Sequence, residues 1–447
     1  MNTFPLKLKK LTQMQVVALG YLAVIAVGTF LLCLPFSSRS GEWTGFTDAF
    51  MTSTSAACVT GLIPVGTYVH WSAFGQIVLL FLMQIGGIGI MTVVALFTKF
   101  LGRNMNLSER KLFMLSSGND SVGGVTKLIR SVTCYTLSFE LIGALILAIR
   151  FIPRSGFKVG LWNAVFHSVS AFCNAGFDLM GRYGESSLMG YTGDIIVNAV
   201  IMLLILAGGM GFIVWQDIFA CRLHPKKFSL HTKVVLFMTG ILFVGGAVLF
   251  FVFELNNPSI NLTLKERILS AMFNSVTPRT AGFNTVDIAT LTDGSIALMI
   301  LLMIIGGAPG STAGGIKITT LVALLAGTIA SARQVNATNI FKRRIDGDLV
   351  RQASAIATIY FVISSVSIVT LCAIEPFSFT QITFEVASAL SNVGMTMGIT
   401  SSLSIVSKLI ISMLMYFGRV GMMSLVIALA AKRENIPISR PTENILL

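Results

Sequence analysis

Four glycines are the positions of this 447-residue sequence whose type and spacing suggest a chemistry. Each is the seventh residue of a similar eight-residue segment, and successive glycines lie 115, 106 and 112 residues apart. A pattern that recurs at such intervals indicates four copies of one unit. The segments are S-A-A-C-V-T-G-L (55–62), S-A-F-C-N-A-G-F (170–177), V-T-P-R-T-A-G-F (276–283) and S-A-L-S-N-V-G-M (388–395).

These segments suit the coordination of a dehydrated monovalent cation by backbone carbonyl oxygens. Glycine reaches the backbone conformations that turn successive carbonyls toward one lane, and it adds no side chain to block that lane. None of the four segments contains an acidic residue, which argues against a divalent site built of carboxylates. The predicted ion selectivity filter comprises Val59, Thr60, Gly61, Asn174, Ala175, Gly176, Thr280, Ala281, Gly282, Asn392, Val393 and Gly394.

A second glycine motif, here called the second glycine landmark, also recurs once in each of the four copies. It follows the four segment glycines by 25, 32, 24 and 24 residues. Small residues let membrane helices approach closely, so we interpret Gly86, Gly87, Gly208 and Gly209 as helix-contact positions.

The elements that position these glycines must lie in a bilayer. The sequence is 54% hydrophobic and 11% charged, with a mean hydropathy of +0.82, whereas soluble domains carry roughly 25% charged residues. About 20 apolar residues are needed to cross the hydrocarbon core. Candidate spans lie near 16–35, 73–98, 128–150, 193–215, 232–253, 296–332, 350–374 and 404–431, and shorter segments near 45–62, 160–177, 267–283 and 380–395 carry the repeated glycines.

We therefore expect an all-α membrane protein in which eight transmembrane helices form four membrane–pore loop–membrane repeats around one axial pore, as in a K+ channel. Backbone that is not helical is tolerated at membrane depth only beside protein or a hydrated cavity, which favours a shared axis. The repeats are placed at 12–101, 126–216, 231–333 and 349–432, within a single integrated membrane domain.

The distribution of Lys and Arg predicts the orientation. Of the 32 basic residues, 21 fall in the two termini and in the loops near 99–130, 217–233 and 333–351, and eight fall on the opposite side. Both termini are thus expected in the cytoplasm, with the four short segments on the outer side. The net charge of +13 is explained by this bias, and no basic face suited to nucleic acid is evident.

The sixth span contains G-G-A-P-G-S-T-A-G-G, through which no helix passes intact. We interpret it as a gate below the filter; a rigid kink is the alternative. Arg419 lies within the eighth span and could act as a cationic barrier or hold this loop, or could pair structurally with Glu140. The gate residues are Gly306, Gly307, Ala308, Pro309, Gly310, Ser311, Thr312, Ala313, Gly314, Gly315 and Arg419.

Other polar residues near the segments receive structural roles. Arg279 is expected to point behind the filter, because a cation on the ion path would repel K+. Asn163 and His167 are expected to support the filter from behind, and Lys317 could face the cytosolic cavity. No His pair has metal-ligand spacing.

The four repeats, S-A-A-C-V-T-G-L and T-P-R-T-A-G-F (277–283) resemble the Trk/Ktr/HKT superfamily of potassium transporters. The length resembles the bacterial Ktr membrane subunit (KtrB type), and the likeness covers about residues 12–435. It implies K+ transport across a bacterial cell membrane, Na+ as an activator, and no organic cofactor in this chain. It also implies a homodimer with one pore per protomer and a separate cytosolic regulatory ring, of octameric type, that binds nucleotides.

Three alternatives come from other classes. The first is a less selective or Na+-conducting channel on the same scaffold, against which glycine at all four aligned positions argues. An intramembrane enzyme would need a nucleophile or metal set such as H-E-x-x-H, and none is found. A secondary transporter would have inverted repeats, whereas these four share one orientation.

Overall fold

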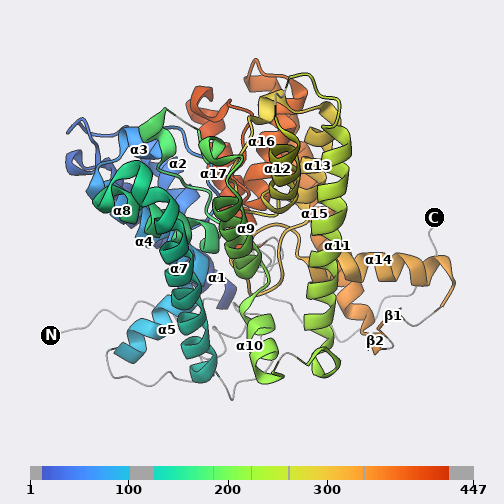
Figure 1. Cartoon of the computed structure of the whole chain (residues 1–447). Coiled ribbons are helices and arrows are strands. Elements are labelled where there is room, and N and C mark those ends of the chain that lie inside the picture. The colour runs from blue at the N-terminus through green and yellow to red at the C-terminus, as the bar shows by residue number, and fades with distance from the viewer. Residues whose placement is uncertain are drawn as a thin grey trace, which may run out of the picture.

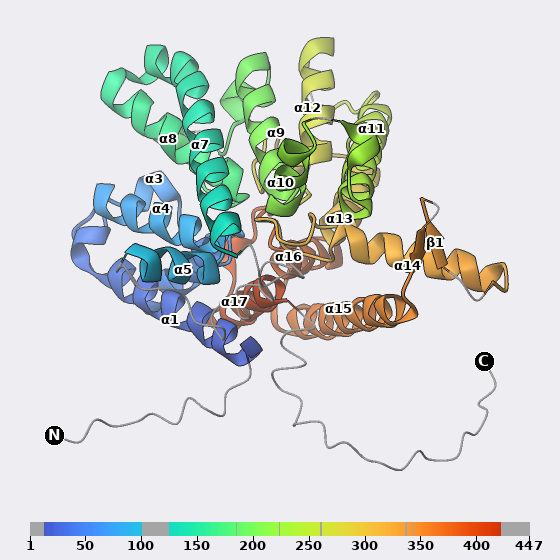
Figure 2. The ribbon, with the colours of Figure 1, turned by 90° about the horizontal axis from the view of Figure 1, so that it is seen from below.

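The computed structural model describes residues 13–421, except 101–124, 185, 223, 260–261, 336–337 and 342. Predictions about both chain ends and most of the loop near 99–130 lie outside these residues. The described chain is almost entirely helical. Viewed along one axis, its helices follow one another in chain order around a common centre (Figure 2).

Four buried short helices lie where the sequence predicts segments too short to span. The third and fourth begin with capping boxes, in which Thr263 and Ser378 exchange hydrogen bonds with Glu266 and Gln381. These caps set the start of each helix at the first residue after a turn. The four helices are α2 (Phe46–Ala57), α8 (Phe157–Cys173), α12 (Leu264–Val276) and α16 (Phe379–Ser391).

Longer apolar helices precede and follow the short ones along the chain (Figure 1). By length and composition, four described helices can cross a membrane, or six if two bent pairs each count as one span. The four are α1 (Gln13–Cys33), α7 (Val125–Ser155), α11 (Leu230–Phe253) and α15 (Gly347–Ile374), and the bent pairs are α4 (Ala73–Ile88) with α5 (Ile90–Phe100) and α9 (Ile195–Gly209) with α10 (Phe212–Ala220). The remaining apolar helices are α13 (Asp293–Ile304), α14 (Ile318–Ala332) and α17 (Ile405–Val420).

The bends correct the expectation of continuous spans at 73–98 and 193–215. The chain turns by 99° between α4 and α5 and by 93° between α9 and α10. At each bend a glycine has positive φ, 87° at Gly89 and 88° at Gly211. Other residues are strained in that region, so these glycines allow the sharp change of direction. The sixth predicted span is likewise divided, into α13 and α14.

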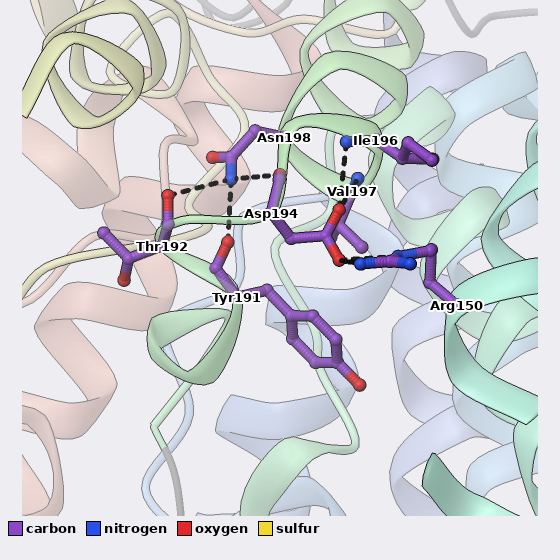
Figure 3. A network of polar contacts seen from close by, with 7 residues as sticks. All are labelled: Arg150, Tyr191, Thr192, Asp194, Ile196, Val197 and Asn198. Carbon is purple, nitrogen blue, oxygen red and sulfur yellow. Dashed lines mark hydrogen bonds and ion pairs between the residues drawn. The ribbon is translucent and has the colours of Figure 1, made fainter. Parts of the chain in front are cut away.

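The ends of three longer helices, α7, α11 and α15, are joined to the starts of later apolar helices. Arg150 near the end of α7 contacts the Asp194 carboxylate at 2.6 Å, and Asp194 caps α9 (Figure 3). In the same network the Asn198 amide donates to the carbonyls of Tyr191, Thr192 and Asp194. These contacts fix the loops that follow the second short helix.

Carboxylates make the corresponding junction in the third and fourth repeats. Glu254 accepts hydrogen bonds from Thr292 and Ser295 at the start of α13, and Glu375 accepts from the Ser404 amide at the start of α17. Burial raises the pKa of Glu254, but hydrogen bonds from these residues and Asn257 outweigh it, so the pKa lies below its ordinary value. The ionised acid thus satisfies helix-start donors in both repeats.

A two-stranded antiparallel hairpin connects the third and fourth repeats. Strand β1 (Thr338–Ile340) pairs with β2 (Arg343–Ile345), and Thr338 faces Ile345. The hairpin lies beside α14 at the edge of the molecule (Figure 1). No strand was expected here.

Candidate functional site

Each short helix leads into an extended loop in which left-handed and ordinary backbone conformations alternate. The residue two places before the aligned glycine has positive φ, and so does the glycine. The first values are 57° at Val59, 59° at Asn174, 77° at Thr280 and 55° at Asn392, and the glycine values are 98° at Gly61, 70° at Gly176, 82° at Gly282 and 90° at Gly394.

This alternation can direct neighbouring carbonyls to one side. In an ordinary strand successive carbonyls point to opposite sides, and a left-handed residue at every second position reverses that. Val59 and Thr280 are β-branched, so holding them at positive φ costs of order 1–3 kcal/mol each. Strain of this kind persists only where the surrounding structure enforces it, and it is a marker of functional backbone.

The four aligned glycines lie against one another in a closed ring, here called the glycine ring. A Cβ built on Gly61 would lie 3.2 Å from the Cα of Gly176, and one on Gly282 would lie 3.3 Å from the Cα atoms of Gly176 and Gly394. A Cβ on Gly394 would lie 2.9 Å from the Cα of Gly61, which closes the ring. Any side chain here would fill the centre.

The carbonyl that precedes each glycine faces the glycine of the preceding repeat around the ring. The Cβ positions of Gly61, Gly176 and Gly282 lie 2.7, 2.8 and 2.5 Å from the carbonyl oxygens of Ala175, Ala281 and Val393. On Gly394 the Thr60 oxygen would be only 1.9 Å away. Thus a main-chain oxygen from each of the four loops lies at the glycine ring.

Hydrogen bonds to the short helices hold the loops. The amide of the residue before the glycine donates to the helix at 2.8–3.0 Å in every repeat, as from Thr60 to Ser55. The Ser55 hydroxyl also accepts from the Gly61 amide, and Ser388 accepts from Gly394. In the other repeats the hydroxyl donates instead, from Ser170 to the Phe177 carbonyl and from Thr277 to the Phe283 carbonyl.

His167 contacts the chain next to the second loop, as expected, whereas the buried Asn163 amide nitrogen has no hydrogen-bond partner among the described residues. The His167 Nδ1 lies 2.7 Å from the Asn163 carbonyl, and Nε2 lies 3.4 Å from the Leu179 amide. This pair of contacts requires the tautomer with a proton on Nδ1, so that Nε2 accepts. The imidazole therefore ties the second short helix to the chain just after its loop.

Two acids near the loops, the buried Glu385 and the half-buried Asp178, were not singled out from the sequence. Glu385 of α16 accepts from the hydroxyls of Thr396 (2.9 Å) and Thr400, just beyond Gly394. Asp178 follows the second loop and accepts from the Met180 amide at 2.9 Å. Both engage the chain that leaves a loop, and only position relative to the repeat could have drawn attention to them.

The second glycine landmark lies directly under the short helices. A Cβ on Gly86 would meet the Ala57 carbonyl at 2.3 Å, and one on Gly208 would meet the Phe172 carbonyl at 2.0 Å. Gly87 lies similarly against the Cys173 thiol. These glycines let the bent helices approach the C-terminal ends of α2 and α8, where the helix dipole presents partial negative charge.

Residues 305–317 between α13 and α14 form what we call the crossing loop. Its ends are joined, because the Gly306 amide donates to the Ile316 carbonyl and the Ile316 amide donates to Ile304. Its middle reaches the second repeat, where the Thr312 amide donates to the Gly208 carbonyl and the Ala308 amide to Gly209. It also borders the fourth repeat, since a Cβ on Gly314 would lie 2.5 Å from Asn392 Oδ1.

Arg419 attaches the crossing loop to the first repeat. Its guanidinium donates to the Thr312 carbonyl and to the Gly86 carbonyl. Glu140, the structural partner considered for Arg419, instead accepts from the Gln84 amide at 3.1 Å. Lys317 folds back and donates to the Ala313 carbonyl at 2.6 Å, so its amine binds the loop itself.

Arg279 is 6% exposed and lies away from the glycine ring, in a small cavity between the second and third repeats. The cavity is bordered by Thr239 and by Gly306 and Gly307, at the start of the crossing loop. Within the described residues no group of three metal-ligating side chains occurs.

Residues 6–436 match the TrkH family, described as cation transport protein. The chain belongs to the TrkH family. This family transports cations and is not an enzyme family.

Relatives within and around the family are similar over nearly the whole chain. The "Potassium/sodium uptake protein NtpJ" of Enterococcus hirae is 40% identical, with 98% of each chain covered. The "Ktr system potassium uptake protein B" of Bacillus subtilis is 39% identical over 96% of each chain. The crystal structure of the potassium transporter TrkH from Vibrio parahaemolyticus shares the fold, with a TM-score of 0.75 and 21% identity over 96% of this chain and 87% of that one.

Proposed function

We propose that this TrkH-family chain is the ion-conducting membrane subunit of a bacterial potassium uptake system. Two relatives at 39% and 40% identity are named as potassium uptake proteins. The single observation that carries the proposal is the glycine ring, in which backbone from four repeats surrounds one centre. Rings of carbonyls that replace a hydration shell are how protein pores conduct dehydrated K+.

The filter is formed by the three residues that end with each ring glycine, the twelve residues named from the sequence. Alternating backbone hand at these positions supports inward carbonyls. The hydroxyl and amide contacts behind the loops keep the opening from closing onto a smaller ion. K+ is the transported ion, and no metal is held beyond K+ at the filter.

The architecture is eight spans in four repeats, 12–101, 126–216, 231–333 and 349–432, around one axial pore. Counting α4 with α5, α9 with α10, and α13 with α14 as one crossing each gives this number when α17 is included. The chain lies in the bacterial cell membrane with both termini in the cytoplasm. The Lys and Arg bias supports this orientation.

Residues 306–315 with Arg419 form the gate. The crossing loop lies where the bent helices meet. It is not helical, and a few hydrogen bonds hold it in place. Release of Thr312 from Arg419 opens the path, whereas the bonded state obstructs it. The rigid-kink alternative predicts that shortening the loop lowers flux.

Assembly and regulation remain part of the proposal. The chain works as a homodimer, one pore per protomer, with a separate nucleotide-binding cytosolic ring of octameric type. Sodium acts as an activator. The second candidate function is a less selective or Na+-conducting channel. The name of the Enterococcus relative, a potassium/sodium uptake protein, is consistent with it.

Cation uptake into proteoliposomes tests the proposal. Wild-type protein is expected to carry ⁸⁶Rb⁺ in preference to ²²Na⁺, and Gly61→Ser is expected to reduce that preference at least tenfold, because one quarter of the carbonyl ring changes. Gly398→Ser is the matched control: its φ is 86°, yet a Cβ there would meet nothing within 4 Å. Equal uptake of the two ions by the wild type would favour the second candidate function, and no uptake would contradict both.

A further inference from the structure

A cavity of about 380 Å³ lies away from the pore, between α11, α14, α15 and the hairpin. These elements adjoin in both overall views (Figures 1 and 2). Its volume is within the range of roughly 300–1,000 Å³ that small-molecule sites occupy. Much of its wall is apolar, contributed by Val234, Val322, Ala323, Ile345, Ala353 and Ile356.

Polar residues, including a cation, also line the cavity. Arg344 and His231 line it, and within the described chain Arg344 has no ion pair and His231 Nε2 has no hydrogen-bond partner although that atom is buried. Asp346 also lines the cavity, and its carboxylate caps α15 by accepting from the Asp348 amide at 3.2 Å. The wall therefore offers unused donors beside an apolar recess.

The cavity lies where the chain enters the membrane. His231 is in the first turn of α11, directly after the basic turn that contains Lys226 and Lys227. By the proposed orientation this is the cytoplasmic surface. Bilayers carry anionic lipids in that leaflet, and basic pockets between membrane helices bind their headgroups.

We propose that this cavity binds an anionic phospholipid, with one acyl chain against the apolar wall and the phosphate at Arg344 and His231. A free phosphate would leave the apolar wall in water, so the lipid is the source to which the shape and charge together point. A zwitterionic lipid would bring a second cation to Arg344 and bind less well.

The site touches the helix that carries the crossing loop. Thr319 and Thr320, in the first turn of α14, line the cavity, and the adjacent Ile318 amide donates to the Gly307 carbonyl at 3.0 Å. An occupant would hold α14 against α11 and α15 and so fix one end of the loop. This consequence rests on the proposed gate; the binding itself does not.

Native mass spectrometry of the full chain tests binding directly. Protein from phosphatidylglycerol nanodiscs is expected to retain a lipid adduct, and Arg344→Gln and the cavity-filling Ala353→Phe are each expected to reduce it at least fivefold. Arg343→Gln is the matched control, an exposed neighbour on β2 that does not line the cavity. An adduct unchanged in Arg344→Gln, equal retention of phosphatidylcholine, or displacement by glycerol phosphate would overturn the proposal.

Flux then separates this inference from the proposed function. The ⁸⁶Rb⁺ uptake of the wild type is expected to change at least threefold when phosphatidylglycerol replaces phosphatidylcholine, and that of Arg344→Gln to stay constant. A lipid adduct with no flux in any lipid would sink the proposed function and leave the site standing. Flux that responds to phosphatidylglycerol equally in wild type and Arg344→Gln would overturn the coupling through this cavity.

Discussion

The glycine ring and the level of the helix breaks use the same fourfold repeat in different ways. Around the ring, all four repeats supply a glycine at positive φ. At the level of the breaks, Gly89, Gly211 and Gly421 have positive φ, 87°, 88° and 92°, and each is the last residue of a G-x-x-G stretch; the described chain bends at the first two. In the third repeat the corresponding residue is Pro309.

Proline explains the difference. Its ring fixes φ near −65°, so the single-glycine bend found at Gly89 and Gly211 cannot form there. Instead, residues 305–317 form the crossing loop, which leaves the end of α13 and leads back to the start of α14. A ring of oxygens that replaces a hydration shell needs equivalent ligands from every repeat. A gate below the ring needs only one element that moves. The comparison suggests that symmetry is kept where ions are selected and broken where passage is controlled.

The largest effect is expected from Gly394→Ala in the ring. The new Cβ would lie 1.9 Å from the Thr60 carbonyl oxygen, and backbone cannot yield as a flexible side chain does. We expect ⁸⁶Rb⁺ uptake to fall at least about 100-fold, equivalent to about 2.7 kcal/mol. Gly398→Ala carries the same backbone strain without the clash and should retain uptake. Normal flux in Gly394→Ala would remove the ring from the ion path.

Freeing the crossing loop should raise flux without changing selectivity. Arg419→Gln removes the charged donors to Thr312 and Gly86, and charge-assisted bonds of this kind contribute about 1.5–3 kcal/mol. Uptake of ⁸⁶Rb⁺ should increase about tenfold, as should that of a variant with a deletion within 308–314. A fall in flux, or loss of the preference for Rb⁺ over Na⁺, would show that the loop is a scaffold and not a gate.

Substitution of two equivalent bend glycines sharpens the comparison. Gly89→Ala meets nothing within 4 Å, whereas Gly211→Ala would meet the Pro309 carbonyl at 2.8 Å. Both should lose about 1–2 kcal/mol of stability from the left-handed backbone. Only Gly211→Ala should also alter ⁸⁶Rb⁺ flux, by about threefold, because it displaces the loop. Thermal unfolding and ⁸⁶Rb⁺ uptake should be measured on both proteins. Equal flux changes in the two variants would contradict this distinction.

The smallest effect is expected from the hydroxyls behind the ring. Ser55→Ala removes the acceptor of the Gly61 amide, and leaving a buried donor unsatisfied costs about 1–3 kcal/mol. Selectivity for Rb⁺ over Na⁺ should fall a few-fold. Ser170→Ala removes a donor to the Phe177 carbonyl, outside the ring, and should change selectivity less. The reverse order would mean that the chain after the glycine controls the opening.

The sequence predicted the short helices and the aligned glycines because both follow from periodic pattern. Segments too short to cross a bilayer, each ending in glycine, leave few arrangements at membrane depth. The break in the sixth span was equally visible, since glycine and proline exclude a helix from 306–315. These features depend on local chain chemistry.

The bends at Gly89 and Gly211 and the partners of Arg419 could not be predicted in the same way. Each glycine closes a G-x-x-G stretch in an apolar run, a pattern that also fits small residues at a contact between straight helices, so only the surrounding structure decides that the chain bends there. Arg419 donates to the carbonyls of Thr312 and Gly86, and a main-chain acceptor leaves no signature in residue type. The carboxylate of Glu140 was the visible candidate, and it pairs with Gln84 instead.

Anomalous diffraction from crystals grown with Tl⁺ in place of K+ tests the central claim most directly. The account predicts a peak on the axis of the glycine ring, coordinated by main-chain oxygens from all four loops, including those of residues adjoining Gly61 and Gly282. Tl⁺ bound only by side chains away from this axis, or no peak among the four loops at saturating Tl⁺, would contradict it.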